Sequence, residues 1–390
     1  MTYQKDDSPG SVDARGSLQA PSGRIELVDE RVVSTRQAST STAVACGPRC
    51  ALVGENEIVC TFMVQSKLGV NDFVPLLSRS HDGGKSWQDE RPLWPNLREN
   101  WSIFGSVSRA PKGELMFFGT RTPIERPGEP NWSAITMGLK QNSLIWARSD
   151  DGGRTWTDPV AIPMEIAGSA EAAGPMCVTR DGRWLACYAP YNTFDTDLVV
   201  DRQQLALVAS DNGGQSWQYQ PLMRFREPAS GAAEAWLIEL ADGRLLSTCW
   251  HTDFTEKHEY FNPYAVSDDG GRTWKGPLST GIRGQSTALA ALPDGAAVLL
   301  YNQRRQGPAG VYLALARPDR EDFHAELNEP VWLAETRTQH GGEGAHSNWE
   351  DFSFGEPSAL PLPGGDIFVV FWCLQPRAQG IRSVRLRITP

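Results

Sequence analysis

The chain has 390 residues, of which 40% are hydrophobic and 22% charged, a composition that supports a large buried core and excludes an intrinsically disordered chain. Lys and Arg number 37 against 47 Asp and Glu, which gives a formal net charge of -10. Proteins that bind a phosphate backbone need the opposite balance, so no nucleic-acid partner is expected. The longest strongly apolar stretch, Ile367–Leu374, has the length of a strand, so no membrane-spanning segment is expected either.

The first 22 residues carry acids, Ser, Gly and Pro where a secretory signal needs an apolar core. We therefore expect residues 1–22 to be a flexible tail and residues 23–390 to form one folded domain. The seven cysteines are an odd number without the spacing of a disulfide scaffold, which favours reduced thiols. These features predict a cytoplasmic protein, and none of them indicates an oligomeric state.

One eight-residue motif recurs four times, with the pattern Ser-x-Asp-x-Gly-x-Thr/Ser-Trp. The paired glycines supply the positive φ of a tight turn, the Asp and Ser side chains can bond to turn amides, and the Trp packs on the hairpin. This chemistry indicates a turn that holds two strands together, not a catalytic site. The copies are Ser80–Trp87, Ser149–Trp156, Ser210–Trp217, in which Asn212 replaces the Asp, and Ser267–Trp274.

The spacing of these boxes matches the blades of a β-propeller. The four tryptophans are separated by 69, 61 and 57 residues, enough for a four-stranded blade with its loops. Each unit also contains an earlier hairpin with a Gly or Asn turn, as at Asp242-Gly243, and the last lies at Gly364-Gly365. Six hairpins predict six units. The sixth unit lacks an outer strand, and residues 24–33 can supply it. We therefore predict an all-β, six-bladed β-propeller of four-stranded antiparallel blades, closed by its N-terminal strand.

The four boxes and six hairpins resemble the sialidase superfamily of Asp-box propellers, over roughly residues 24–390. The box also occurs in propellers that are not enzymes, so function has to be argued from the loops. Successive turns of an antiparallel meander alternate between two faces. The less common residue types collect on the face opposite the boxes, as expected for a sugar-binding cleft. The candidates for substrate binding are Arg49, Arg121, Trp132, Tyr191, Asn192, Arg304 and Arg305.

Two carboxylates match the family by position. Glu234 lies eight residues before Asp242 and looks like the sialidase glutamate that acts as a base on a tyrosine nucleophile. Asp72 lies where the resemblance places an acid/base aspartate. The chain departs from the family at the arginine triad: the Phe-Arg-Ile-Pro signature is absent, Arg49 is one place out of register, and Trp250 and His251 occupy the place of the second arginine.

The tyrosine nucleophile is also replaced, in the same register, by Glu356. Glu234 and Glu356 both belong to inner strands, and two carboxylates across a sugar are the usual minimum for glycoside hydrolysis. The leading hypothesis is therefore a glycoside hydrolase that acts on a saccharide, including an acidic one, without a cofactor. A second is a lyase that uses His251, Tyr191 and Arg305 on a uronate. A third is a propeller that binds glycans or proteins without turnover. No short pair of histidines indicates a metal site.

Overall fold

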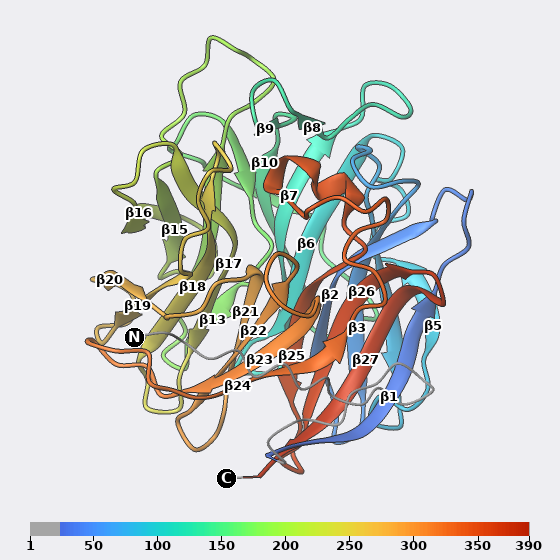
Figure 1. Cartoon of the computed structure of the whole chain (residues 1–390), viewed down its shortest axis with the longest axis vertical. Coiled ribbons are helices and arrows are strands. Elements are labelled where there is room, and N and C mark those ends of the chain that lie inside the picture. Colours follow the sequence, from blue (N-terminus) through green and yellow to red (C-terminus); the bar gives the residue numbers. More distant parts are fainter. Residues whose placement is uncertain (1–23, 390) are drawn as a thin grey trace.

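Six antiparallel sheets follow one another along the chain in the computed structural model, which describes residues 24–389 (Figure 1). The predicted tail, residues 1–22, lies outside the described residues. The first blade contains β2 (Val44–Leu52), β3 (Ile58–Gln65), β4 (Val74–Ser80) and β5 (Gln88–Pro92). The second contains β6 (Trp101–Arg109), β7 (Leu115–Pro123), β10 (Ser143–Ser149) and β11 (Val160–Ile162). A small hairpin of β8 (Trp132–Ser133) and β9 (Gly138–Leu139) interrupts the second blade.

The third blade differs because its inner strand is broken in two. Its strands are β12 (Ser169–Glu171), β13 (Cys177–Val178), β14 (Trp184–Tyr191), β15 (Gln204–Ser210) and β16 (Gln218–Arg224). The fourth contains β17 (Ser230–Glu239), β18 (Leu245–Asp253), β19 (Pro263–Ser267) and β20 (Lys275–Ser279). The fifth contains β21 (Gln285–Ala291), β22 (Ala297–Gln303), β23 (Gly310–Ala316) and β24 (Ala325–Leu333).

The last blade is built from both ends of the described chain. It contains β25 (Phe354–Pro361), β26 (Ile367–Gln375) and β27 (Ala378–Ile388), with β1 (Ile25–Thr35) as the outer strand. The β1 register on β27 runs from Ile25 opposite Ile388 to Thr35 opposite Gly380, and Figure 1 shows the two strands side by side. The innermost strand β25 contacts β2 of the first blade. The predicted six-bladed propeller and its closure by the N-terminal strand are therefore confirmed.

The Asp boxes act as the predicted turn locks. In the second box the Asp151 carboxylate accepts hydrogen bonds from the amides of Arg154 and Thr155 and from the Thr155 hydroxyl, at 2.6 to 2.9 Å. These donors hold the pKa of Asp151 at about 2, against the opposing effect of desolvation. Asn212 accepts the equivalent amide bond from Ser216 at 2.9 Å, so the lock works with a neutral oxygen as well.

Each box also packs against the blade before it. At Gly214, which has a φ of 83°, a Cβ would approach the Trp146 and Trp184 rings to 2.8 and 2.9 Å, so a side chain does not fit there. The Trp87 ring lies 6.1 Å from Phe368 of the last blade. The boxes therefore join neighbouring blades as well as closing their own turns.

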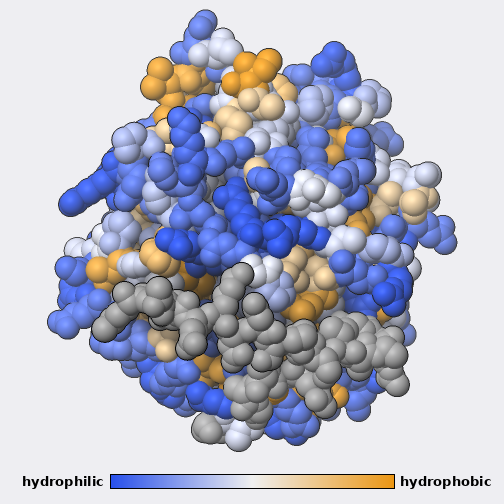
Figure 2. Space-filling view, viewed as in Figure 1, coloured by the Kyte–Doolittle hydropathy of each residue, from blue (hydrophilic) through white to orange (hydrophobic). Residues whose placement is uncertain are grey.

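Polar side chains dominate the surface in the view of Figure 2, where apolar residues form small, separate patches. No helix within residues 24–389 has the length and apolar character needed to cross a bilayer. The helix η1 (His346–Asp351) lies at the same end of the molecule as β8 and β9 (Figure 1). That end also holds the cavity described next.

Candidate active site

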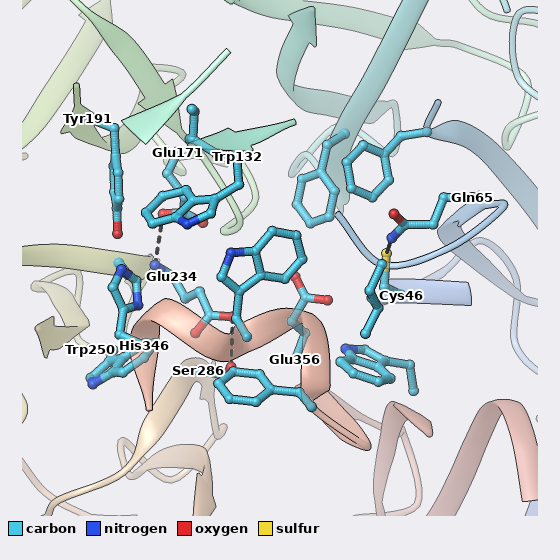
Figure 3. A pocket seen from close by; sticks show the side chains of 18 of the residues that line it. Cys46, Gln65, Trp132, Glu171, Tyr191, Glu234, Trp250, Ser286, His346 and Glu356 are labelled. Carbon is cyan, nitrogen blue, oxygen red and sulfur yellow. Dashed lines mark hydrogen bonds between the residues drawn. The ribbon is translucent and has the colours of Figure 1, made fainter. Parts of the chain in front are cut away.

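A cavity of about 150 Å³ lies where the inner strands of the blades meet η1 and the β8–β9 hairpin (Figure 3). Three carboxylic acids line it: Glu171, Glu234 and Glu356. Its walls are mainly aromatic and are formed by Phe73, Phe104, Trp132, Tyr191, Trp250, Trp349, Phe352 and Trp372. A second cavity of about 140 Å³ shares Glu171, Phe104 and Trp349 with the first. The two cavities therefore adjoin, and Glu171 belongs to the lining of both.

The acids enter the cavity from matching irregularities in the inner strands. Glu234 in β17 and Glu356 in β25 have φ values of 50° and 45°, each at a break in the strand register. Ser286 in β21 and Gly47 in β2 lie at equivalent breaks, with φ values of 56° and 58°. A β-bulge re-aims the side chain of its extra residue, and positive φ is costly for residues other than Gly. The fold therefore holds Glu234 and Glu356 in strained positions that direct them inward.

Hydrogen bonds from the same bulges fix the three carboxyl groups. The Glu234 amide donates to Glu171 Oε2 at 2.8 Å, and the Gly47 amide donates to Glu356 Oε2 at 2.8 Å. The Ser286 hydroxyl donates to Glu234 Oε1 at 2.7 Å. Glu234 Oε2 is buried and has no hydrogen-bond partner among the described residues. Its capacity to form a hydrogen bond is therefore not used by the described part of the protein.

The environment makes these acids hold their protons to unusually high pH. Burial raises the pKa of Glu171 to about 8, and the charge of Glu234 adds to the effect. Burial and the charge of Glu356 raise the pKa of Glu234 to about 7. Burial also raises the pKa of Glu356, but Arg49, the Gly47 amide, Trp372 and Arg304 oppose the rise. All three acids of the cavity thus have raised pKa values, and at Glu356 hydrogen bonds and positive charges limit the rise.

The two arginines near these acids are bonded within the protein. Arg49 lies below the cavity and donates to the carbonyl oxygens of Pro48, Glu356 and Ala173 at 2.8 to 3.1 Å. Arg304 lines the cavity, but one terminal nitrogen donates to Gln285 Oε1 at 2.8 Å and the other to the Phe354 carbonyl. Arg49 thus bonds to backbone carbonyls, and Arg304 bonds to one backbone carbonyl and one side-chain amide. The sequence predicted both arginines as substrate ligands.

Of the other predicted residues, Tyr191 and Trp132 line the cavity, with ring centroids 6.1 Å apart. Asp72 does not line it: its carboxylate accepts hydrogen bonds from the Ser66 amide and hydroxyl. Asn192 donates to the Thr136 carbonyl at 2.6 Å, and the Arg121 guanidinium stacks on Trp101 at 4.7 Å. Neither side chain belongs to the cavity lining.

His251 also lies outside the cavity lining. Its ring is stacked between Phe225 and Tyr260, 4.4 Å from each, and Nε2 lies 3.1 Å from the Ser230 hydroxyl. Arg305 lies beside the carbonyl of Gly344 at 3.3 Å. The structure therefore does not bring His251, Tyr191 and Arg305 together around one substrate, and the elimination hypothesis has no support from this geometry.

Two cavity residues were missed from the sequence. Glu171 had a signal, because Gly168-Ser-Ala-Glu-Ala172 repeats the pattern Gly231-Ala-Ala-Glu-Ala235 around Glu234. His346 was not assigned to the site, although its loop before Glu356 was expected on the same face, and it enters the cavity from η1. Within residues 24–389, no three His, Cys, Asp or Glu side chains are grouped so as to hold a metal ion.

Sheet order and boxes together define a six-bladed Asp-box propeller with an acid-lined cavity at one end. Residues 108–342 match the family model of the BNR repeat-like domain, and the chain belongs to this family. It is 24% identical over 258 residues to a sialidase of Micromonospora viridifaciens. The aligned region covers 58% of this chain and 37% of that protein. The chain thus spans little more than a third of that curated relative.

Solved structures show the same fold at low sequence identity. A Dyadobacter fermentans protein of unknown function has a TM-score of 0.72 at 19% identity, over 94% of this chain and 100% of that one. A Hadza microbial sialidase has a TM-score of 0.62 at 18% identity, over 88% and 66% of the two chains. An α-L-arabinanase of Penicillium chrysogenum, in complex with arabinobiose, has a TM-score of 0.60 at 15% identity, over 93% and 98%.

Proposed function

We propose that this chain is a glycoside hydrolase in which Glu234 and Glu356 act on a sugar bound in the cavity. One observation carries the proposal: both acids project from strained bulges into the same aromatic-lined cavity (Figure 3). Backbone strain at two acids of one cavity is typical of a functional site. The similarity to sialidases and to an arabinanase supports carbohydrate chemistry in general.

The surroundings of the two acids favour different roles. Glu234, with a pKa of about 7 and an unpartnered Oε2, can protonate the oxygen of the glycosidic bond as it breaks. Glu356 receives the Gly47 amide hydrogen bond and lies near two guanidinium groups. These stabilise its carboxylate form, which can attack the sugar carbon directly or activate a water molecule. Environments that separate the pKa values of paired acids are typical of glycosidases.

The hydroxyl of Tyr191 fits a supporting role at most. Burial and the neighbouring Glu171 and Glu234 raise the pKa of Tyr191 far above its usual range. A phenol that resists ionisation is a weak nucleophile, so the tyrosine scheme of sialidases has no obvious counterpart in this cavity. Tyr191 can still pack against a sugar ring beside Trp132.

Product analysis by mass spectrometry tests the proposal directly. The protein is incubated with neutral glycosides, uronides and sialosides, beside the variants Glu234→Gln and Glu356→Gln. Glu239→Gln is a matched control, because Glu239 belongs to the same strand as Glu234 but pairs with Arg180 outside the cavity. Release of a sugar with gain of water, lost in both cavity variants and kept in the control, supports hydrolysis. Saccharide binding without any product would support a binding propeller.

A further inference from the structure

We infer that the cavity binds an uncharged sugar unit, and that His346 forms a hydrogen bond to one of its hydroxyl groups. This inference rests on the proposed carbohydrate function and adds the class of substrate. It differs from the sequence-based expectation, which included acidic sugars. Three features carry it: the charge of the lining, the bonding of the arginines, and the unpartnered polar atoms of the cavity.

The charge of the lining is unfavourable for an anionic sugar. Glu171, Glu234 and Glu356 face the cavity, and Arg304 is the one cationic side chain among the described residues that line it. Like charges brought together in a site of low polarity cost several kcal/mol. A carboxylate on the sugar would therefore repel the ionised forms of these acids and raise their pKa values further, which removes the carboxylate that the proposed reaction needs. An uncharged sugar meets no such cost and can accept or donate hydrogen bonds to them.

Arg304 is poorly placed to compensate for a substrate carboxylate. Its terminal nitrogens bond to Gln285 and to the Phe354 carbonyl, and its guanidinium lies 3.8 Å from the ring centre of Phe352 and 4.8 Å from that of Phe354. Binding of a carboxylate by arginine uses two parallel N–H groups on one edge of the fork. Each terminal nitrogen of Arg304 already donates one hydrogen bond within the protein, and the direction of these two bonds fixes the guanidinium against Gln285 and Phe354, with Nε as its one nitrogen that has no partner among the described residues.

The adjoining cavity is uncharged apart from the shared Glu171. Its polar lining consists of hydroxyl and amide side chains: Ser102, Thr120, Thr122, Asn131 and Asn142. Within the described lining of this cavity there is no Lys, Arg or His. Hydroxyl and amide groups suit the hydroxyl groups of a neutral saccharide. The same preference therefore extends to the next sugar along the chain of the substrate.

His346 supplies the clearest unused hydrogen-bonding group. Its side chain is 7% exposed, and neither Nδ1 nor Nε2 has a hydrogen-bond partner among the described residues. The ring lies among aromatic side chains, with centroids 5.0 Å from Trp250 and 5.7 Å from Trp132. Figure 3 shows it facing the cavity beside Glu234. Buried polar atoms normally have partners, so these two ring nitrogens are free to bond to a molecule in the cavity.

The imidazole is neutral at physiological pH. Burial lowers the pKa of His346 to about 4, and the positive charges of Arg305 and Arg202 add to the effect against the attraction of Glu256. A neutral imidazole has one donor and one acceptor, which matches a sugar hydroxyl group. A cationic imidazole would instead favour an anion, so the neutral form agrees with the charge of the lining.

The test compares sugars that differ only in charge. Turnover of 4-nitrophenyl glucoside and galactoside is compared with that of the glucuronide and galacturonide, together with a 4-nitrophenyl sialoside and arabinoside. Binding of the corresponding free sugars is followed by tryptophan fluorescence in Glu234→Gln, since Trp132, Trp250, Trp349 and Trp372 line the cavity. We expect a neutral sugar to exceed every acidic one by roughly 100-fold or more, in turnover or in binding.

The role of His346 is tested by two substitutions. His346→Phe keeps the aromatic ring and should weaken binding of the preferred neutral sugar by roughly 10-fold, the effect of one hydrogen bond. His346→Gln keeps a donor and an acceptor and should retain more of the binding. His324→Gln is the control, because His324 is exposed and bonded to Asp319 outside the cavity.

Different results overturn the two proposals. An acidic sugar that binds or reacts as well as the best neutral one would overturn the inference, as would the failure of every neutral sugar to bind. Equal binding by wild type and His346→Phe would overturn the role of His346. A neutral sugar that binds without any product would instead contradict the hydrolase proposal and leave the inference standing.

Discussion

The backbone amide of Glu234 donates a hydrogen bond to the side chain of Glu171, 2.8 Å away, so that one cavity acid is held by the main chain of another. The bond joins the inner strands of the third and fourth blades. It satisfies an amide that the bulge removes from the regular strand pairing. Glu171 therefore connects the geometry of Glu234 to the protonation of the cluster.

Glu171→Gln should make the protein more stable in alkaline solution. Because the folded-state pKa of Glu171 is raised to about 8, the folded state binds its proton more tightly than the unfolded state. Stability must then fall as the pH rises from about 4.5 towards 8. A shift from 4.5 to about 8 corresponds to at most roughly 5 kcal/mol. Thermal unfolding of both proteins should differ little at pH 4.5 and favour the variant at pH 8.5. A variant that is equally destabilised at both pH values would refute this reasoning.

Activity should fall as the pH rises through about 7. Glu234 must carry a proton to act as the acid, and its pKa is raised to about 7 by burial and by Glu356. The Ser286 hydroxyl bonds to Glu234 and stabilises its ionised form. Ser286→Gly, which suits the φ of 56°, should therefore move the falling limb of the pH–rate profile to higher pH. An unchanged limb in this variant would mean that another group controls it.

Glu234→Gln and Glu356→Gln should each reduce kcat strongly. Loss of a positioned acid or base costs about 10²- to 10⁴-fold, and loss of a nucleophile costs more. The stereochemistry of the product, followed by NMR, separates the two schemes for Glu356. Retention would indicate a covalent intermediate on Glu356, whereas inversion would indicate an activated water. Wild-type rates in either variant would remove that acid from the mechanism.

Arg49→Met should destabilise the fold more than it changes substrate affinity. Arg49 is 2% exposed and donates to the carbonyl oxygens of Pro48, Glu356 and Ala173. Its removal leaves these acceptors without their partner, at a cost of about 2 to 4 kcal/mol. Urea unfolding should show the loss, while KM of the folded variant changes little. A large rise in KM at unchanged stability would restore Arg49 as a substrate ligand.

The contribution of the Asp side chain to a box can be tested at Asp151, and the third box, with Asn212 in the same place, serves as the natural comparison. Asp151→Asn should lose less than about 1 kcal/mol, because Asn212 occupies the same place in the third box and accepts the equivalent amide bond. Asp151→Ala removes the acceptor of the hydrogen bonds from Arg154 and Thr155 and should lose about 2 kcal/mol. Unfolding of the two variants under the same conditions compares them. Equal losses of about 2 kcal/mol would show that the amide oxygen of Asn does not replace the carboxylate in this turn.

The sequence predicted the fold better than the site. The fold signal lies in short continuous motifs, whereas the site depends on contacts between segments that are far apart in the sequence. A box is complete within eight residues, so its glycines and its Trp are visible in the sequence. Glu234 and Glu356 were found for a similar reason, since each lies at a fixed distance before a hairpin turn. His346 and Trp349 belong to η1, whose position depends on packing against other loops. Sequence spacing carries no information on such contacts.

The arginines show the limit of reading roles from residue type. A guanidinium predicts an anion ligand when its surroundings are unknown, yet Arg49 bonds to three backbone carbonyls. Bulges in β2 and β25 break the regular pairing near these carbonyls, and the need for a buried donor there follows only from the three-dimensional arrangement. In the same way, His251 proved to be stacked between two aromatic rings.

Pairing of β1 with β27 sets the order of events during synthesis. The first described strand completes a blade whose other three strands are the last three of the described residues. The earlier blades can form while translation continues, but the edge of β27 finds its partner only after the ribosome has released nearly the whole chain. Until then two strand edges stay exposed to other chains. Premature termination anywhere before Ala378 would therefore leave an open array that is prone to aggregate.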